Sequence, residues 1–454
     1  MKVALVNPNQ YTSYPQPPLG LLTIASVIRQ AGHEVKLVDA NLEKLKSVSI
    51  IERVYDADIM GITAVTPTIT EAKRIADTVK DAIPRMPIIL GGAHGTLLPE
   101  ETLHYGSFDY IVQGEGEDAV KTLLRWFRPG GLNGRLIGVM HRGKGIIIDA
   151  GKAPDVKDLD ALPILAYDLL GKDYQPHPPH GLYPPAMPVI TSRGCPYSCT
   201  FCSKPVFGNH YRAQSPERVL DELIYLKRLG VREIIFYDDI FTLDRRRIMR
   251  LMDLMTPLRL HWTCETRVDL VDGELLQEMK RAGCFAIAYG IESASSEVRE
   301  GLCKRIKDAD IVSAIYFTRK FGIQTIGYFM IGSPNETPQS IKDTIALAKA
   351  LKLDYAQFAV TTPFPGSVLY DKYVEQGKPI DWESFSYLRT DGKTMPVFES
   401  EHFTKADILK AVQQANRSFY LNPVYILRRL KRLLGSRVEW GITLRGLRMF
   451  LKLQ

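Results

Sequence analysis

The sequence has little of what marks secreted, disulfide-bonded or membrane-spanning proteins. Its 454 residues contain six cysteines, far fewer than a disulfide scaffold uses. No window approaches the roughly 18 apolar residues of a membrane span. The first residues, MKVALVNPNQ, lack a basic stretch followed by a long apolar run. We therefore expect a cytoplasmic protein of two or three globular domains, each able to bury its own core.

Nucleotide-binding signatures and a general excess of basic charge are also missing. No G-x-G-x-x-G follows the first predicted strand, and no G-x4-G-K-[ST] occurs. The net charge of +7 comes from residues 424–454, which hold eight Lys or Arg and one Glu. This tail is rich in Leu and short of aromatic residues that stack on bases, so we expect no nucleic-acid partner.

Strands and helices alternate through residues 1–150. KVALVNP has the pattern of a buried strand, GLLTIASVIRQAG that of an amphipathic helix and HEVKLVDAN that of the next strand. Such β-α-β units predict an α/β domain with a doubly wound parallel sheet, which binds ligands at the loops that leave the carboxyl ends of its strands. These loops are glycine-rich or built of small residues, and they suit a broad ligand with amide edges better than a phosphate.

Three further regions follow. Residues 151–187 are predicted to be a linker, because QPHPPHGLYPPAMP carries neither a helix nor a central strand; its His177 and His180 are expected to be solvated or packed in the loop. Residues 188–370 alternate again, with six predicted parallel strands that form a barrel or part of one. Residues 371–454 are expected to be helical and to end in the basic tail.

The first barrel strand runs into TSRGCPYSCTFCSK, which spaces Cys195, Cys199 and Cys202 as C-x3-C-x2-C. A structural zinc ion takes four ligands, and no second pair of cysteines or histidines lies nearby. Three thiolates with an open position favour an iron–sulfur cluster whose fourth iron binds a substrate or cofactor. Chance spacing, or a zinc site completed from afar, remains the alternative. The other three cysteines lack such spacing and are expected to be buried small side chains: Cys264, Cys284 and Cys303.

This motif, with Phe201 before the last cysteine, resembles the radical S-adenosylmethionine (SAM) superfamily. The resemblance implies a [4Fe-4S] cluster whose unique iron is chelated by the amine and carboxylate of SAM. It also implies a 5′-deoxyadenosyl radical that abstracts a substrate hydrogen, and an external electron donor such as flavodoxin or ferredoxin.

The same resemblance implies roles for residues near the ends of the later strands. Asp238 and Asp239 would accept hydrogen bonds from the methionine amine, and Arg267 would pair with the methionine carboxylate. The ribose or carboxylate would contact Glu292 and Ser293, and the adenine would pass Gly327 and Met330. For each of these residues, a helix cap, a structural salt bridge or core packing is the alternative.

The N-terminal region resembles the cobalamin-binding domain of cobalamin-dependent radical SAM enzymes, on the segments PPLGLLTIASVIRQAGHEVKLVDAN, GGAHGT and GEGE. Hopanoid-pathway proteins and anaerobic Mg-protoporphyrin ester cyclases are similar. The D-x-H-x-x-G motif that supplies a histidine to cobalt elsewhere is absent, so we expect cobalamin without a histidine ligand; a domain that binds no cobalamin would show the same absence. The resemblance places cobalamin near Pro18, Gly20, Thr66, Thr68, Gly91, Gly92, His94, Gly95, Gly114, Glu115 and Glu117. Of these, His94 is expected to be a hydrogen-bonding loop residue.

The resemblance implies an enzyme that methylates an unactivated carbon of a small-molecule substrate, with methylcobalamin as the methyl donor. A radical cyclase, another oxidoreductase or a C–C bond-forming enzyme with the same cofactors is the alternative. A corrinoid or iron–sulfur carrier without catalysis is the third hypothesis.

The tail has two interpretations. Ile426, Leu427, Leu430, Leu433 and Leu434 recur at helical spacing, and basic residues fall largely elsewhere on the helix. Such a helix could lie on an anionic membrane, which would suit a lipid or other apolar substrate. Alternatively, the apolar stripe packs on the barrel and the arginines are solvated.

Overall fold

The computed structural model describes residues 1–443 except 13, 129, 132–133, 144, 172–173, 175–179, 378–379, 386–398, 401, 436–438 and 442. The chain forms two compact units. Unit 1 holds residues 1–174, 202–212 and 364–394, and unit 2 holds residues 175–201, 213–363 and 395–454. Two later segments thus fold with the N-terminal region, and the predicted domain limits stay a prediction. His177 lies outside the described residues.

Unit 1 is built on a seven-stranded sheet in the order β2-β1-β3-β4-β5-β6-β7. The five strands from β2 to β5 pair in parallel, with Lys2 of β1 opposite Glu34 of β2, whereas β6 and β7 are antiparallel. The strands are β1 (Lys2–Asn7), β2 (Glu34–Asp39), β3 (Ile59–Thr63), β4 (Ile88–Gly91), β5 (Tyr110–Val112), β6 (Val139–Gly143) and β7 (Ile146–Asp149). The doubly wound parallel sheet is confirmed, and the antiparallel pair at its edge was not predicted.

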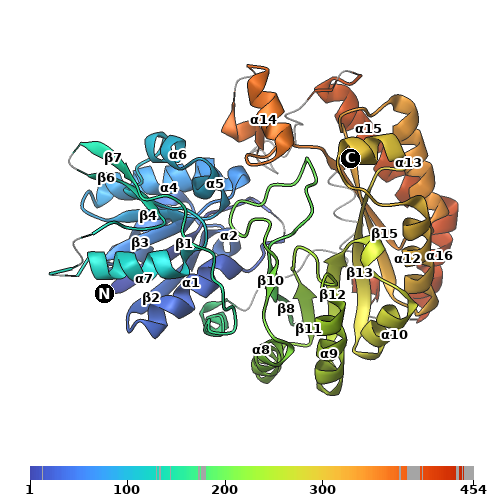
Figure 1. Ribbon diagram of the computed structural model, residues 1–454, viewed down its shortest axis with the longest axis horizontal. Coiled ribbons are helices and arrows are strands. Elements are labelled where there is room, and N and C mark those ends of the chain that lie inside the picture. Colours follow the sequence, from blue (N-terminus) through green and yellow to red (C-terminus); the bar gives the residue numbers. More distant parts are fainter. Residues whose placement is uncertain are drawn as a thin grey trace. The chain divides into compact units, whose positions relative to one another are not determined.

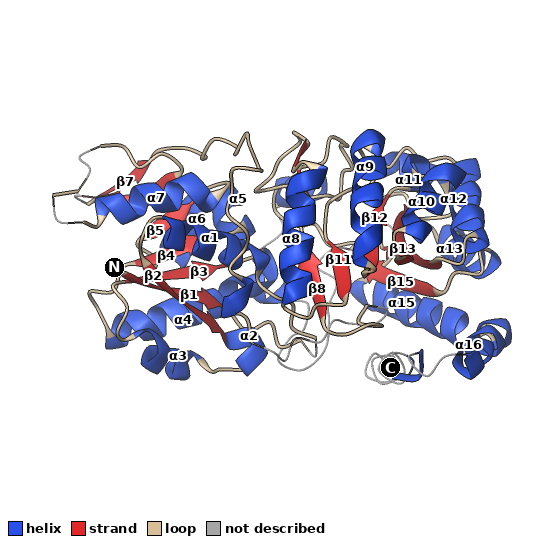
Figure 2. Ribbon diagram, turned by 90° about the horizontal axis from the view of Figure 1, so that it is seen from below, coloured by secondary structure: helices blue, strands red, loops and turns tan. Residues whose placement is uncertain are grey.

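Helices cover both faces of this sheet. In Figure 2, α1 and α7 lie together on one side of the strands, and α3 and α4 lie together on the other. The side chains of Val6, Leu22 and Ile62 are fully buried, which explains the near-continuous apolar runs of the central strands. The helices and short 3₁₀ turns of unit 1 are α1 (Leu19–Gln30), α2 (Ala40–Glu43), α3 (Ser47–Val54), η1 (Thr66–Thr68), α4 (Ile69–Ala82), α5 (Ala93–Leu97), α6 (Pro99–Tyr105), α7 (Gly116–Trp126), η2 (Tyr167–Leu169), α14 (Val368–Glu375) and η5 (Trp382–Phe385).

Unit 2 contains a six-stranded, all-parallel sheet whose spatial order follows the chain: β8-β11-β12-β13-β14-β15. This confirms the predicted partial barrel. Its strands are β8 (Ala186–Val189), β11 (Glu233–Phe236), β12 (His261–Thr266), β13 (Cys284–Glu292), β14 (Gln324–Ile331) and β15 (Tyr355–Val360). The short strands β9 (Ser192–Arg193) and β10 (Arg212–Ala213) lie before and after the cysteine loop. Strand β8 is at the edge of the sheet, where Pro188 is tolerated.

The helices of unit 2 lie along the outer side of the curved sheet (Figure 1). They are α8 (Pro216–Arg228), α9 (Arg245–Met255), α10 (Gly273–Arg281), α11 (Ser296–Gly301), α12 (Asp308–Lys320), α13 (Pro338–Ala350), α15 (Lys405–Tyr420) and α16 (Pro423–Gly435), with the 3₁₀ turns η3 (Thr256–Leu258) and η4 (Val268–Leu270). Cys264 and Cys284 are buried in adjacent strands, as predicted. His180 is buried and its Nδ1 lies 3.0 Å from Thr263 Oγ1, so it is a loop-packing histidine.

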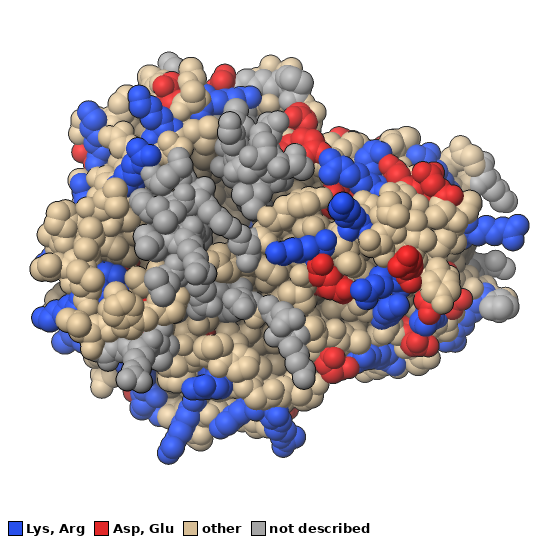
Figure 3. Space-filling model, turned by 180° about the vertical axis from the view of Figure 1, so that it is seen from behind, with Lys and Arg blue, Asp and Glu red and all other residues tan. Residues whose placement is uncertain are grey.

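None of the helices in the described part of the chain is long and apolar enough to cross a membrane. Figure 3 shows basic and acidic side chains side by side in the right-hand part of the face that it draws. This mixture agrees with the balanced charge of residues 1–423.

We expect Gly92→Ala to destabilise unit 1 by about 1–3 kcal/mol, because Gly92 has a φ of +97° and a Cβ there would lie 2.7 Å from the carbonyl oxygen of Ala64. The neighbouring Gly91 is the matched control, since a Cβ at that position meets nothing within 4 Å. Urea unfolding of both variants measures the difference. Equal loss in the two variants would contradict the close approach.

Candidate active site

The cysteine loop begins at a buried carboxylate. Asp238, which follows β11, accepts hydrogen bonds from Thr191 N, Thr191 Oγ1 and Ser192 Oγ, each at 2.6 Å. Burial raises the pKa of Asp238, although Arg247 and these donors favour the charged form. The side chain is 2% exposed. This carboxylate therefore holds the chain just before the three cysteines, and its contact with the methionine amine stays a prediction.

Cationic side chains surround the first part of the loop. The sulfur of Cys199 lies 3.9 Å from the carbonyl oxygen of Cys303, and Thr200 N donates to Leu302 O at 3.0 Å. Burial raises the pKa of the Cys199 thiol, and the positive charges of Lys304 and Arg267 oppose that rise. Cys303 is half-buried beside this loop, which corrects the expectation that it is a fully buried side chain.

Two aromatic side chains of the loop lie over these cations. The guanidinium carbon of Arg267 is 3.8 Å from the ring centroid of Tyr197, and Lys304 Nζ is 6.0 Å from that of Phe201. Soft thiolates next to positive charge suit an iron–sulfur cluster, because binding requires the thiols to lose their protons. Among the described residues, no three His, Cys, Asp or Glu side chains are grouped closely enough to hold a single metal ion. In a cluster, by contrast, each thiolate binds a different iron.

Arg267 and Glu292 are both buried at strand ends, as predicted, and each is already paired. Arg267 donates from Nε and Nη2 to Asp269 at 2.9 and 3.0 Å, and from Nη2 to Lys304 O at 3.0 Å. Glu292 Oε1 accepts from Lys304 Nζ at 2.8 Å. Glu292 also has a φ of +68° at an irregularity in the pairing of β13 with β14. Such strain at a strand end is typical of a functional site.

Two further predicted residues, Ser293 and Gly327, have contacts within the protein. Ser293 is fully buried; its hydroxyl lies 3.2 Å from Thr344 Oγ1 and accepts from Ser295 N, so it holds the turn after β13. A Cβ on Gly327 would lie 2.5 Å from Leu353 Cδ1 and 2.9 Å from Phe329 Cε2, so Gly327 faces the buried packing of β14. The ligand contacts expected for both residues stay predictions. Met330, half-buried, shares the opposite face of β14 with Tyr328.

A pair that was not predicted lies on that opposite face. Tyr328 donates its hydroxyl proton to Glu265 Oε1 at 2.9 Å. Burial raises the pKa of Glu265, the bond from Tyr328 opposes the rise, and the negative charge of Asp239 adds to it. Asp239 is exposed, in contrast to Asp238. The alternation of polar and apolar residues in β12 and β14 could have pointed to Glu265 and Tyr328. It does not show, however, which face of a strand is open.

The loops of unit 1 meet at the carboxyl ends of β3 and β4. His94 Nδ1 lies 3.2 Å from Thr66 Oγ1, and its ring packs edge-on against Trp382 with centroids 4.8 Å apart. Burial lowers the pKa of His94 to about 4. Thr68 closes η1, because its hydroxyl accepts from Val65 N at 3.1 Å. His94 is thus within hydrogen-bonding distance of a neighbouring side chain, as predicted, but it lies in helix α5 and not in a loop.

Other predicted cobalamin residues have structural contacts. Glu115, 2% exposed, accepts from Arg212 Nη2 and Val156 N at 2.6 Å each, so it anchors these two segments, and its contact with cobalamin stays a prediction. Glu117 is buried, and its charge contributes to the raised pKa of Arg212. Cβ atoms on Gly95 and Gly114 would meet Ile111 and Lys152 at 3.0 and 2.8 Å.

Two predicted residues, Gly20 and Gly91, do border open space. Pro18 precedes α1 and is half-buried, and Gly20 is exposed. Added Cβ atoms on Gly20 and Gly91 meet nothing within 4 Å. Backbone accessible in this way at the carboxyl ends of β1 and β4 fits a broad ligand such as cobalamin. The strand order 2-1-3-4-5 places the topological switch point between β1 and β3, where such sheets bind cofactors.

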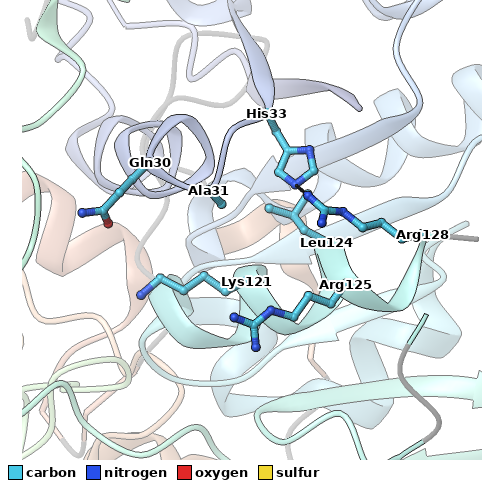
Figure 4. Close-up of a pocket in the computed structure, with 7 residues that line it drawn as sticks. All are labelled: Gln30, Ala31, His33, Lys121, Leu124, Arg125 and Arg128. Carbon is cyan, nitrogen blue, oxygen red and sulfur yellow. Dashed lines mark hydrogen bonds between the residues drawn. The ribbon is translucent and has the colours of Figure 1, made fainter. Parts of the chain in front are cut away.

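A separate basic cavity of ≈270 Å³ lies in unit 1 (Figure 4). Lys121, Arg125 and Arg128 line it, and Arg128 Nη2 is 2.9 Å from His33 Nε2. Burial, followed by the positive N-terminus and Arg128, lowers the pKa of His33. His33 precedes β2, so the cavity is at the amino end of a strand and not among the predicted cofactor loops.

A doubly wound sheet followed by a parallel partial barrel with C-x3-C-x2-C after its first strand defines a radical SAM protein with an added N-terminal domain. Two family models match: the B12 binding domain over residues 11–124 and the Radical SAM superfamily over residues 189–348. An uncharacterized methyltransferase, PH0819, of Pyrococcus horikoshii is 34% identical over 441 residues, 94% of each chain.

Two further proteins are similar. The anaerobic magnesium-protoporphyrin IX monomethyl ester cyclase of Cereibacter sphaeroides is 26% identical over 93% of this chain and 70% of its own. The solved structure of the methyltransferase TsrM of Kitasatospora setae has a TM-score of 0.70 at 18% identity, over 83% of this chain and 75% of that one. The chain belongs to the cobalamin-dependent radical SAM methyltransferase family.

Family membership confirms the predicted fold, enzyme class and cofactors: a [4Fe-4S] cluster, SAM and cobalamin. Enzymes of this class act on small molecules and need a reductant. The hypothesis of a carrier without catalysis is set aside. The roles of the individual site residues stay predictions.

We expect the triple replacement of Cys195, Cys199 and Cys202 by alanine to abolish the iron–sulfur absorbance, because these thiolates are the proposed cluster ligands. The matched control replaces Cys264, Cys284 and Cys303 by alanine and should keep about four irons per chain. Iron analysis of anaerobically reconstituted protein measures both. Iron that persists in the first variant would refute the ligand set.

We also expect unit 1 to lose stability as the pH falls from about 6.5 to about 4, because unfolded histidine takes up a proton in this range and folded His94 does not. The contribution is about 3 kcal/mol, at about 1.36 kcal/mol per pKa unit. Urea unfolding across this range should show a smaller pH slope for His94→Asn. The exposed His104→Asn is the control, and an unchanged slope in His94→Asn would contradict the buried, neutral state.

Proposed function

We propose that the protein is a C-methyltransferase, which places a methyl group on an unactivated carbon of a small molecule. The observation that carries this proposal is the match to a protein named as a methyltransferase over 94% of both chains. The barrel supports carbon as the acceptor. A nucleophilic oxygen or nitrogen can take a methyl group from SAM directly, whereas an unactivated carbon must first lose a hydrogen atom.

When bound, the cofactors supply a carbon-centred radical for hydrogen abstraction and a cobalt-bound methyl group for transfer. The chain would hold the cluster with Cys195, Cys199 and Cys202. The other side chains of unit 2 would bind and orient SAM, and their contacts suggest which part of SAM each one meets.

Asp239 is the residue that we assign to the methionine amine. It is exposed at the end of β11, and its charge already acts on Glu265. When two carboxylates raise each other's proton affinity, a cation placed between them stabilises their charged forms. The ammonium of SAM is such a cation. Asp238, one residue earlier, has its oxygens occupied by Thr191 and Ser192.

Arg267 is the residue that we assign to the methionine carboxylate. Its bonds to Asp269 and Lys304 use Nε and Nη2, and none of these bonds uses Nη1. The guanidinium can therefore meet a carboxylate without breaking its ion pair. Glu292, paired with Lys304, would face the ribose from the strained end of β13.

For unit 1 we propose that cobalamin lies over the loops after β1, β3 and β4, without a histidine ligand to cobalt. The accessible Gly20 and Gly91 and the occupied Nδ1 of His94 support this arrangement. We also propose flavodoxin or ferredoxin as the electron donor, a cytoplasmic location, and an apolar or lipid substrate, for which the C-terminal helix gives the reason below.

We expect the anaerobically reconstituted protein with cobalamin and reductant to form both 5′-deoxyadenosine and S-adenosylhomocysteine from SAM. Trideuterated SAM should pass its label to cobalamin. Asp239→Asn should raise the KM for SAM by about tenfold, equivalent to about 1.4 kcal/mol, while the exposed Asp253→Asn on α9 should not. Liquid chromatography with mass spectrometry measures the products.

The two alternatives give different products. Formation of 5′-deoxyadenosine without S-adenosylhomocysteine or labelled cobalamin would replace the methyltransferase with a non-methylating enzyme, as the cyclase relative suggests. No SAM cleavage at all would refute both.

A further inference from the structure

Helix α16 packs on unit 2 through its arginines. Arg428 donates to the carbonyl oxygens of Lys352 and Leu353, at 2.6 Å each, where α13 has ended. Arg432 pairs with Asp354 at 2.9 Å, and Arg429 pairs with Glu439 at 2.8 Å. These contacts correct the expectation that the arginines are solvated. They also correct the interpretation in which all basic side chains of the helix face lipid.

The apolar side of the same helix faces outward. Leu427 is 73% exposed and Leu434 is 88% exposed, and Val424 and Leu430 are more than half exposed. These positions are spaced by three or four residues, so they form one face. Only Leu433 of the predicted stripe is buried, at 7%. The alternative interpretation expected the apolar stripe to pack on the barrel, and the structure contradicts it.

A cavity of ≈250 Å³ is lined by the arginine side of α16 and by Lys431 from its exposed side. Five basic residues line it, and Asp354 is the one carboxylate among the lining residues described. Two guanidinium nitrogens, Nη1 of Arg429 and Nη1 of Arg432, are buried and have no hydrogen-bond partner among the described residues. Burial lowers the pKa of Arg428, Asp354 opposes this, and Arg319 and Arg432 add to it. A cavity of this kind is complementary to an anion with several oxygens, such as a phosphate.

We propose that α16 docks the enzyme on an anionic phospholipid surface. The exposed leucines enter the apolar layer, and the arginine cavity takes the phosphate of a headgroup. Charge complementarity decides the partner, because a neutral apolar surface would leave the surplus of guanidinium groups unmatched. Lys431, exposed between Leu427 and Leu434, lies where it can meet further headgroups. This inference does not depend on the reaction that the enzyme catalyses.

The test is co-sedimentation of the full-length holoenzyme with vesicles of phosphatidylglycerol mixed with phosphatidylcholine, compared with phosphatidylcholine alone. The protein should pellet with the anionic vesicles only, and added salt should release it. Leu427→Gln combined with Leu434→Gln should reduce binding by about tenfold or more. Both side chains are exposed, so the fold should survive, and circular dichroism checks this.

Two control variants remove equivalent groups elsewhere. Leu229→Gln with Val312→Gln removes two exposed apolar side chains of unit 2, at 51% and 55% exposure. Lys121→Gln with Arg125→Gln removes two charges from the cavity of unit 1. Both variants should bind vesicles like the original protein. Lys431→Gln should weaken binding to the vesicles. Inorganic phosphate, added at the ionic strength of the salt control, should compete with the headgroup for the cavity but not with the contacts of the leucines.

Several results would overturn the proposal. Equal pelleting of the original protein and the Leu427/Leu434 variant would show that the apolar face does not contribute to binding. Equal pelleting with both vesicle types would show that the arginines do not contribute. Full release by phosphate, but not by chloride at equal ionic strength, would identify a free phosphate ligand. A different set of results would assign this face to a second copy of the chain: light scattering shows a dimer for the original protein and a monomer for the Leu427/Leu434 variant, and neither protein pellets with vesicles.

Discussion

Buried carboxylates that accept backbone N–H groups hold both ends of the strands of unit 2 in place, and the candidate site depends on those at the carboxyl ends. Asp238 binds Thr191 N at 2.6 Å, Glu233 binds Gly181 N at 2.7 Å, and Glu336 binds Gly332 N at 2.6 Å. A buried carboxylate is costly unless hydrogen bonds compensate it, and a buried N–H left unpaired costs about 1–3 kcal/mol. Each group therefore requires the other. The cysteine loop leaves β8 at a position fixed by such a pair.

This constraint explains which parts of the site were predictable. Parallel strands bring their carboxyl ends together, so polar residues after β11, β12 and β13 could be assigned to one edge of the sheet from the sequence. The fold class and the cysteine motif followed from spacing and alternation in the same way. What spacing could not supply was the direction of neighbouring side chains, because successive residues near a strand point to opposite faces. Asp238 and Asp239 differ in this way.

The same limit applies to α16. Its apolar residues recur at helical spacing, so the helix itself was predictable. The pattern suggests that leucines face the protein and arginines face water. The opposite orientation depends on the carbonyl oxygens of Lys352 and Leu353 and on Asp354, which the fold places beneath the helix. Cations near the carboxyl end of a helix are stabilised by its unpaired carbonyl groups, and long arginine stems also contribute packing. None of these partners is adjacent to α16 in the sequence.

His94 shows why charge state and access must be considered separately. Burial that lowers its pKa to about 4 keeps the imidazole neutral at physiological pH, and a neutral imidazole is the form that binds a metal. Protonation therefore gives no reason to exclude His94 as a cobalt ligand. Geometry gives that reason, because the ring is 1% exposed, Nδ1 is within hydrogen-bonding distance of Thr66, and Trp382 packs edge-on at 4.8 Å. These contacts support our proposal that His94 does not replace the histidine of the missing D-x-H-x-x-G motif.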